Sequence, residues 1–156
     1  MKTGIPRKIV SGGQTGADRS ALDWAISRGV PHGGWCPKGR KAEDGVIPPQ
    51  YQLTEMTSSD YPSRTEQNVL DSDGTVIISI EAALGSRGSA LTQRLAEKHH
   101  KPWLHVHAGA LGPGENLRSF VVMHGIQTLN VAGPRASSEP GIAQFVRLVL
   151  DGAFGP

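Results

Sequence analysis

The residues of this chain best suited to chemistry form a glycine-rich stretch near its start, Ser11-Gly12-Gly13-Gln14-Thr15-Gly16-Ala17-Asp18-Arg19. The stretch follows the apolar residues Ile9 and Val10 and opens a segment with helical periodicity. Where a strand passes through such a turn into a helix, backbone N–H groups point toward a bound anion and the helix dipole favours negative charge. Glycine allows positive φ angles and the close approach of a phosphate-sized group. The stretch therefore predicts a site for a phosphorylated or oxyanionic ligand.

The spacing of this stretch excludes two familiar phosphate-binding motifs. A Walker A loop requires Gly-Lys-Ser/Thr beginning five positions after its first glycine, but Ala17 and Asp18 follow Gly12 at that distance. A dinucleotide-binding fingerprint requires Gly-x-Gly-x-x-Gly, and Ser11 stands at its first position. The alternative that the glycines merely join a strand to a helix stays open, since turn glycines are common.

Two further polar loops follow strand-like segments. The loop Gly85-Ser86-Arg87-Gly88-Ser89 comes after the β-branched run 75–80, and the loop 132–138, with Gly133 and Arg135, comes after the apolar run 128–131. In open α/β sheets the ligand lies outside the carboxyl ends of the strands. We therefore expect the three loops to converge on one edge of a sheet and to form one binding site.

Strand-like and amphipathic segments alternate along the chain. Strands are expected over 8–11, 34–36, 53–56, 75–80, 103–107 and 128–131. Helices are expected over 17–28, 63–70, 91–99 and 113–125, with a last one beginning near Pro140. Ser63 and Glu66 have capping-box spacing at the start of the second helix. This order predicts an α/β fold of three layers, a mainly parallel sheet with helices on both faces.

Composition narrows the class of protein. The 156 residues suit a single domain over 1–156, and a formal net charge of +2 is too small to indicate nucleic acid as a partner. No apolar run approaches the roughly 18 residues that span a bilayer, and we expect no signal peptide. A lone cysteine, Cys36, excludes an internal disulfide and favours a cytoplasmic location.

Several charged and hydroxyl side chains lie in or beside the predicted loops. Guanidinium groups match oxyanions with two N–H donors, although surface arginines with local ion pairs are the ordinary alternative. Asp18 is suited to contact the ligand or to interact with the helix dipole, and Glu43 and Asp44 to hold a metal or sugar or to remain solvated. His105 and His107 would share one side of a strand, but no third metal ligand has a suitable spacing, so we predict no metal site. The residues predicted to hold the ligand are Gly12, Gly13, Gln14, Thr15, Gly16, Asp18, Arg19, Lys38, Arg40, Arg64, Gly85, Ser86, Arg87, Gly88, Ser89, Gly133 and Arg135.

The order of the motifs resembles that of the molybdenum carrier family, also described as a circularly permuted, YpsA-like branch of the SLOG superfamily. The motifs that carry the resemblance are Gly12-Gly13-Gln14-Thr15-Gly16-Ala17-Asp18-Arg19, Gly34-Trp35, Pro37-Lys38-Gly39-Arg40, Ala42-Glu43-Asp44-Gly45, Ile47-Pro48, Arg64-Thr65, Asn68-Val69, Ser72-Asp73, Gly85 to Ser89, Lys101-Pro102 and Asn130-Val131-Ala132-Gly133-Pro134-Arg135. The resemblance implies a Rossmann-like fold shared with the LOG, or lysine-decarboxylase-like, proteins. It implies a nucleotide-derived or pterin-phosphate ligand, with the molybdenum cofactor as the candidate. It also allows a homo-oligomer.

One position departs from the pattern of the LOG enzymes, which hydrolyse the N-glycosidic bond of nucleoside monophosphates. Their motif Gly-Gly-x-Gly-Thr-x-x-Glu ends in a glutamate, whereas Thr92 stands at that position here and has no carboxylate to act as a base. The resemblance therefore favours a carrier or binding protein over an N-glycosidase (phosphoribohydrolase). The enzyme remains the alternative, with Asp18 or Glu66 as a replacement carboxylate, and a third hypothesis is an interaction module whose loops bind nothing.

Overall fold

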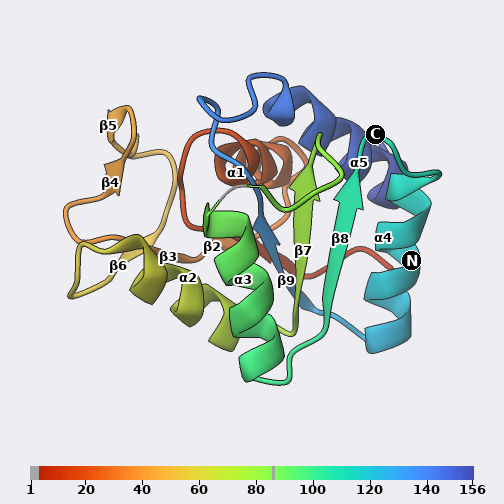
Figure 1. Ribbon diagram of the computed structural model, residues 1–156, viewed down its shortest axis with the longest axis horizontal. Helices are drawn as coiled ribbons and strands as arrows, with labels where there is room; N and C mark the ends of the chain where they lie inside the picture. Colours follow the sequence, from red (N-terminus) through yellow and green to blue (C-terminus); the bar gives the residue numbers. More distant parts are fainter. Residues whose placement is uncertain (1–3, 86) are drawn as a thin grey trace.

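The computed structural model describes residues 4–85 and 87–156. Its centre is a five-stranded sheet in the order β2-β1-β9-β7-β8. Figure 1 shows β9, β7 and β8 of this sheet side by side. All neighbouring strands run parallel. The strands are β1 Lys8–Val10, β2 His32–Gly33, β7 Gly74–Ser79, β8 Trp103–His107 and β9 Thr128–Ala132. The central strands β1, β9 and β7 therefore end side by side, at one edge of the sheet.

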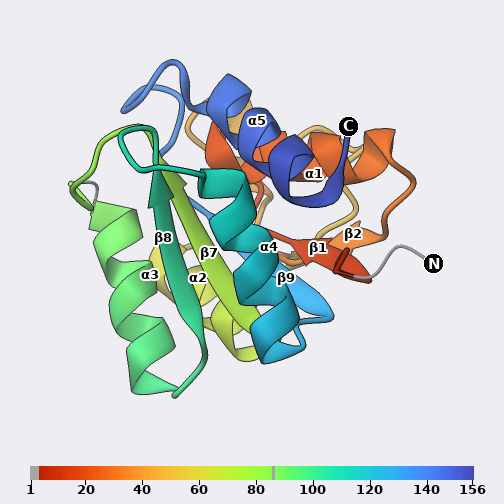
Figure 2. The same cartoon turned by 90° about the vertical axis from the view of Figure 1, so that its right-hand side faces the viewer.

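Helices cover both faces of this sheet, as Figure 2 shows. One face carries α1 Ala17–Ser27, α4 Pro113–His124 and α5 Ile142–Phe154, which pack on one another. The opposite face carries α2 Tyr61–Leu70 and α3 Arg87–Lys98. The predicted α/β sandwich with a mainly parallel sheet is confirmed.

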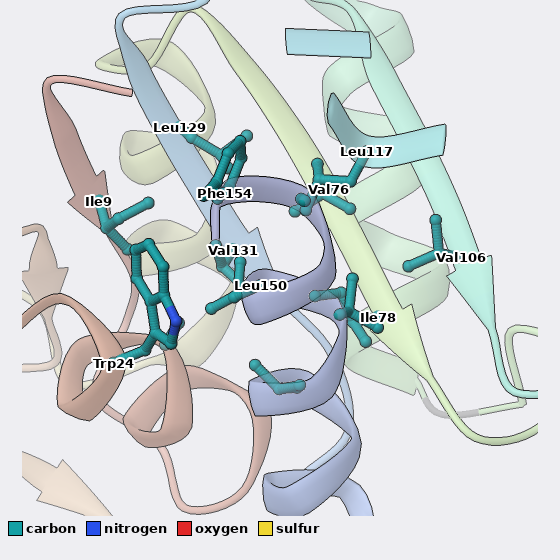
Figure 3. Close-up of a cluster of buried hydrophobic side chains, with 14 of the residues drawn as sticks. Ile9, Trp24, Val76, Ile78, Val106, Leu117, Leu129, Val131, Leu150 and Phe154 are labelled. Atoms are coloured by element: carbon teal, nitrogen blue, oxygen red, sulfur yellow. The ribbon is translucent and has the colours of Figure 1, made fainter. Parts of the chain in front are cut away.

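The two faces of the sheet differ in chemistry. Side chains of Val76, Ile78, Leu129 and Val131 join Trp24, Leu150 and Phe154 in the main apolar core against α1, α4 and α5 (Figure 3). Successive residues of a strand point to opposite faces, so the alternate residues Thr75, Ser79 and Asn130 lie on the side of α2 and α3. These polar residues are 0 to 3% exposed. The second face therefore offers buried polar groups beneath the carboxyl edge.

Two small strand pairs lie outside the main sheet. Strand β3 Trp35–Cys36 pairs with β6 Thr54–Glu55, so the strand predicted over 34–36 does not join the large sheet. Strands β4 Lys41–Ala42 and β5 Gly45–Val46 form a hairpin that projects beyond the sheet at the upper left of Figure 1. The hairpin brings its Glu43-Asp44 turn back to the glycine loops, where the sequence predicted only an irregular polar loop.

Helix α2 begins earlier than its sequence pattern suggested. The predicted capping residue was Ser63, but the helix starts at Tyr61 and is capped by Asp60, whose Oδ1 accepts a hydrogen bond from Ser63 N at 2.7 Å. The extra residues place Tyr61 in the first turn of the helix, near the loops.

In the described part of the chain, no helix combines the length and apolar character needed to cross a membrane.

Candidate functional site

A cavity of about 440 Å³ lies at the carboxyl edge of β1, β9 and β7 and extends toward α2 and α3. This volume falls within the ~300–1,000 Å³ typical of small-molecule sites. The cavity is lined by residues of all three predicted loops, among them Gly12, Gln14, Gly88, Gly133 and Arg135. Three segments that are distant in sequence therefore share one site.

Gln14, Asp18 and Arg64 form the part of the cavity lining that we call its floor, and two of them make a buried ion pair. Arg64 of α2 donates from Nη1 to Asp18 Oδ2 at 3.1 Å, and each side chain is 10% exposed. The backbone N–H of Gln14 donates to the same carboxylate oxygen at 3.2 Å. The guanidinium passes directly against Gly12, where any added Cβ would overlap it. The glycine is therefore needed so that an arginine from α2 can reach the first loop.

The protonation of Asp18 depends on this pair. Burial raises the pKa of Asp18 above its usual value, and the charge of Arg64 together with the N–H donors opposes that rise. Among the described residues that line the cavity, Asp18 is the one carboxylate. Both Asp18 Oδ2 and Arg64 Nη1 are engaged within the protein, so the carboxylate acts first as a partner for Arg64.

Two donors beside this pair have no partner in the protein. Arg64 Nε and Gln14 Nε2 are both buried and make no hydrogen bond. The orientation of the Gln14 amide is fixed because its Oε1 accepts from Thr15 N at 3.0 Å and from Glu43 N at 2.9 Å. A buried donor without an acceptor is costly, and both residues line the cavity. Two residues of the cavity lining thus each hold a donor that the protein leaves unpaired.

Positive charge gathers around Tyr61, whose ring is contacted by two arginines of the cavity lining and by Lys41. Lys41 Nζ lies 4.6 Å from the centre of its ring, Arg64 Cζ 5.4 Å and Arg135 Cζ 5.5 Å. Arg64 and Arg135 line the cavity, as does Arg87 at the start of α3. The arrangement places positive charge beside the cavity.

Glu43 joins the hairpin to two of the glycine loops. Its carboxylate accepts hydrogen bonds from the Thr15 hydroxyl and from Ser137, through Oγ at 2.5 Å and through N at 3.3 Å. The Thr15 Oγ1 in turn accepts from Ala136 N at 3.2 Å. The neighbouring Asp44 forms a two-pronged ion pair with Arg19, at 2.5 and 2.8 Å. Both acids of the turn thus hold the loops in place.

Replacing Glu43 with glutamine is expected to speed hydrogen exchange at the amides of Ala136 and Ser137. The hydrogen bonds from Ser137 and Thr15 lower the pKa of Glu43, so its contribution to stability is present above the ordinary carboxyl pKa. That contribution is lost as the pH falls through the lowered value. Exchange measured by mass spectrometry at pH 7 checks the expected result, with the exposed Glu81→Gln as the matched control. Equal exchange in both variants would contradict the assigned role.

Other predicted ligand residues serve the fold of the loops. Arg40 donates to the carbonyl oxygens of Ile47, Pro48 and Tyr51, and Arg19 donates to Gly13 O as well as to Asp44. Neither guanidinium lines the cavity. These two arginines are therefore satisfied by the protein, which is the ordinary alternative for a loop arginine.

The remaining predicted residues fall into four groups. Gly13 packs closely against Leu53 and Ile47, and an added Cβ at Gly16 would lie 2.6 Å from Pro134 O, so both permit loop packing. Lys38 and Gly85 are exposed and lie outside the cavity lining, whereas Ser89 is buried in α3. Ser86 lies outside the described residues.

Five polar residues that line the cavity were not among the predicted ligand residues, although they lie in the quoted motifs or in the third loop: Thr65, Asn68, Asn130, Ser137 and Ser138. Asn130 donates from Nδ2 to Thr75 Oγ1 at 3.2 Å. Thr92 also lines the cavity, with its hydroxyl donating to Gly88 O at 2.8 Å. The sequence patterns predicted the strands and helices, but they did not predict that one buried face of the sheet would carry polar side chains.

Other candidate residues have partners elsewhere. Glu66 pairs with Lys98 and His99 at 3.2 and 2.7 Å, so it links α2 to α3. His105 Nε2 lies 2.7 Å from Ser79 Oγ. Within residues 4–85 and 87–156, no group of three or more His, Cys, Asp or Glu side chains is placed to hold a metal ion.

Comparison with known proteins gives two matches. The model of the circularly permutated YpsA SLOG family matches residues 9–154. A 1.45 Å crystal structure from Syntrophus aciditrophicus SB, of a protein named "putative molybdenum carrier protein", is 51% identical, with a TM-score of 0.90. The match covers 95% of this chain and 94% of that one. No curated protein matches the chain. The family predicted from the motifs is confirmed.

Proposed function

We propose that this chain, which belongs to the circularly permutated YpsA SLOG family, binds a small phosphorylated ligand in the cavity at the carboxyl edge of its sheet. The observation that carries the proposal is a cavity lined by the three loops and by Arg64, Arg87 and Arg135, in which Arg64 and Gln14 each hold a buried donor without a partner. A phosphoryl group supplies several acceptor oxygens and a negative charge at once. The proposed ligand is a nucleotide-like molecule or a pterin phosphate. The proposed location of the protein is the cytoplasm.

The surrounding residues suit this ligand. The loops at Gly12 and Gly133 bring backbone close to the cavity, and Arg87 and Arg135 contribute positive charge at its walls. A guanidinium binds a phosphoryl group through two parallel hydrogen bonds. The hydroxyls of Ser137 and Ser138 and the amide of Asn130 add neutral polar groups for the rest of the ligand.

The molybdenum cofactor is the candidate cargo by relationship, since the similar structure from Syntrophus aciditrophicus carries the name of a molybdenum carrier protein. The donors on the cavity floor fit the phosphate and oxo groups of such a molecule. The described lining residues include no cysteine or histidine, and Cys36 is buried in a separate cluster. We therefore propose that this chain would hold the cofactor through its anionic groups, without a thiolate or imidazole ligand to the metal.

A nucleotide hydrolase of the N-glycosidase type is the alternative. Such an enzyme needs a carboxylate near the reacting sugar, and Asp18 is the one described carboxylate in the cavity. The ion pair with Arg64 occupies Asp18 Oδ2, and the hydroxyl of Thr92 is engaged with Gly88 O. Both contacts favour binding over turnover. Free base released from nucleoside monophosphates, and lost in Asp18→Asn, would favour the hydrolase instead.

Replacing Arg135 with methionine is expected to weaken inorganic phosphate binding by about 10- to 100-fold, the cost of one charge-assisted contact. Isothermal titration calorimetry at low and at physiological salt checks this result. Arg147→Met is the matched control, because Arg147 is an exposed arginine of α5 outside this cavity. Both variants lose one positive charge, so a general charge effect would weaken binding equally in the two and contradict a specific role for Arg135.

The proposal as a whole is tested by the small molecule that co-purifies with the wild-type protein, identified by mass spectrometry after denaturation. We expect a phosphorylated compound that raises the melting temperature when it is added back, since a ligand that binds only the folded state stabilises it. No increase in melting temperature with phosphate, nucleotides or pterin phosphates would overturn the proposal and favour an interaction module.

A further inference from the structure

Three cationic side chains from three separate segments meet at the ring of Tyr61. Lys41 comes from strand β4, Arg64 from α2 and Arg135 from the loop after β9, all within 5.5 Å of the ring centre. We infer that Lys41 and Arg135 form a second anion subsite beside the cavity, so that the ligand carries two phosphoryl groups. This inference rests on the proposed function.

Among the described residues, two of the three cations in this cluster have no carboxylate in ion-pair contact. Arg64 is paired with Asp18, but neither Lys41 nor Arg135 makes an ion pair in the described part of the chain. The charge of Glu43 partly offsets that of Arg135, although its oxygens accept hydrogen bonds from Thr15 and Ser137 and make no ion pair with Arg135. Like charges gathered at one ring repel. A bound anion would relieve this repulsion.

The cluster extends the cavity outward. Arg64 and Arg135 line the cavity and also contact Tyr61, whereas Tyr61 and Lys41 lie beyond its lining. The unpartnered Arg64 Nε and Gln14 Nε2 lie within the lining. Arg64 is buried and belongs to both sets: its Nε is one of the unpartnered donors, and its guanidinium lies near Tyr61 with Lys41 and Arg135. A ligand that meets both sets needs an anionic group on each side of Arg64.

The ring of Tyr61 lies within 5.5 Å of all three cations. A cation near an aromatic ring is held by the quadrupole of the ring, which here fixes the direction of long, flexible side chains. The cluster thus favours a diphosphate, as in a nucleoside diphosphate or a molecule built on one, over a ligand with a single phosphate.

The experiment compares inorganic phosphate with pyrophosphate as probes. Calorimetric titrations without divalent cations are run on the wild-type chain, Lys41→Met and Lys38→Met. Wild type is expected to bind pyrophosphate at least about tenfold more tightly than phosphate, and Lys41→Met is expected to lose most of this preference. Lys38→Met removes the same charge from a neighbouring exposed position outside the cavity and should keep the preference.

The outcomes separate this inference from the proposed function. Equal affinity of wild type for the two probes would overturn the second subsite and leave the binding of a phosphorylated ligand standing. An equal loss of affinity for both probes in Lys41→Met would overturn it as well. Binding of neither probe would overturn the proposed function, and the second subsite with it.

Discussion

Replacing Arg64 with methionine is expected to lower the free energy of unfolding by about 3–5 kcal/mol, the usual cost of removing one partner from a buried ion pair. Asp18 would then keep a carboxylate in the interior with only backbone donors to support it. The same change removes the unpartnered Nε from the cavity floor, so phosphate binding is expected to be lost. Urea denaturation at pH 7 measures the first effect, and calorimetric titration measures the second.

The double variant Asp18→Asn/Arg64→Met separates the two consequences. Without a buried charge, its stability should recover most of what Arg64→Met loses, whereas its binding should not recover. The destabilisation of Arg64→Met should also shrink at acidic pH, because burial raises the pKa of Asp18 and the protonated group needs no cation. A double variant as unstable as Arg64→Met alone would contradict the assignment of the ion pair as the cause.

Replacing Gly133 with alanine is expected to destabilise the fold by about 1–3 kcal/mol, the range for overpacking a rigid interior, and to displace the third loop. An added Cβ would overlap the carbonyl oxygen of Ile78 and lie 2.7 Å from Ala17 Cβ. These groups belong to the end of β7 and the start of α1, so neither can move without disturbing the sheet. The loop that carries Arg135 would therefore leave its place at the cavity, and phosphate binding would weaken.

Thermal and urea denaturation of Gly133→Ala should be compared with Gly152→Ala. Gly152 lies in α5, and an added Cβ there would meet only Gly114 Cα at an ordinary 3.5 Å. Alanine also favours the helix more than glycine does. The control is thus expected to be neutral or stabilising with unchanged phosphate binding. Unchanged stability in Gly133→Ala would contradict the close packing of β7, α1 and the third loop.

The sequence predicted the elements that have strong local signals, and with them the edge of the sheet at which the cavity lies. The apolar runs at β7, β8 and β9 indicated a parallel sheet, and parallel strands place their carboxyl ends at one edge. The sequence was a weaker guide to the start of α2, where two residues could each cap the helix. Asp60 and Ser63 both suit a helix N-cap, and the structure uses Asp60.

The roles of the arginines could not be predicted because they depend on contacts between distant segments. Arg40 and Arg135 both lie in polar loops, yet Arg40 donates to carbonyl groups while Arg135 lines the cavity. Lys41 gave no signal as a site residue, since only the β4–β5 hairpin brings it to Tyr61. Motif spacing is informative about a loop and the helix that follows it, whereas a charge cluster built from three segments depends on how the chain folds.

The central claim is that the unpartnered donors of the cavity floor bind an anionic ligand. The most direct measurement follows the Nε–H resonance of Arg64 and the side-chain amide resonances of Gln14 by NMR during titration with inorganic phosphate. We expect these signals to move together with one dissociation constant, while the Nε–H signal of Arg40, which donates to Ile47 O, stays in place. Phosphate binding that leaves the Arg64 and Gln14 signals unmoved would contradict the account.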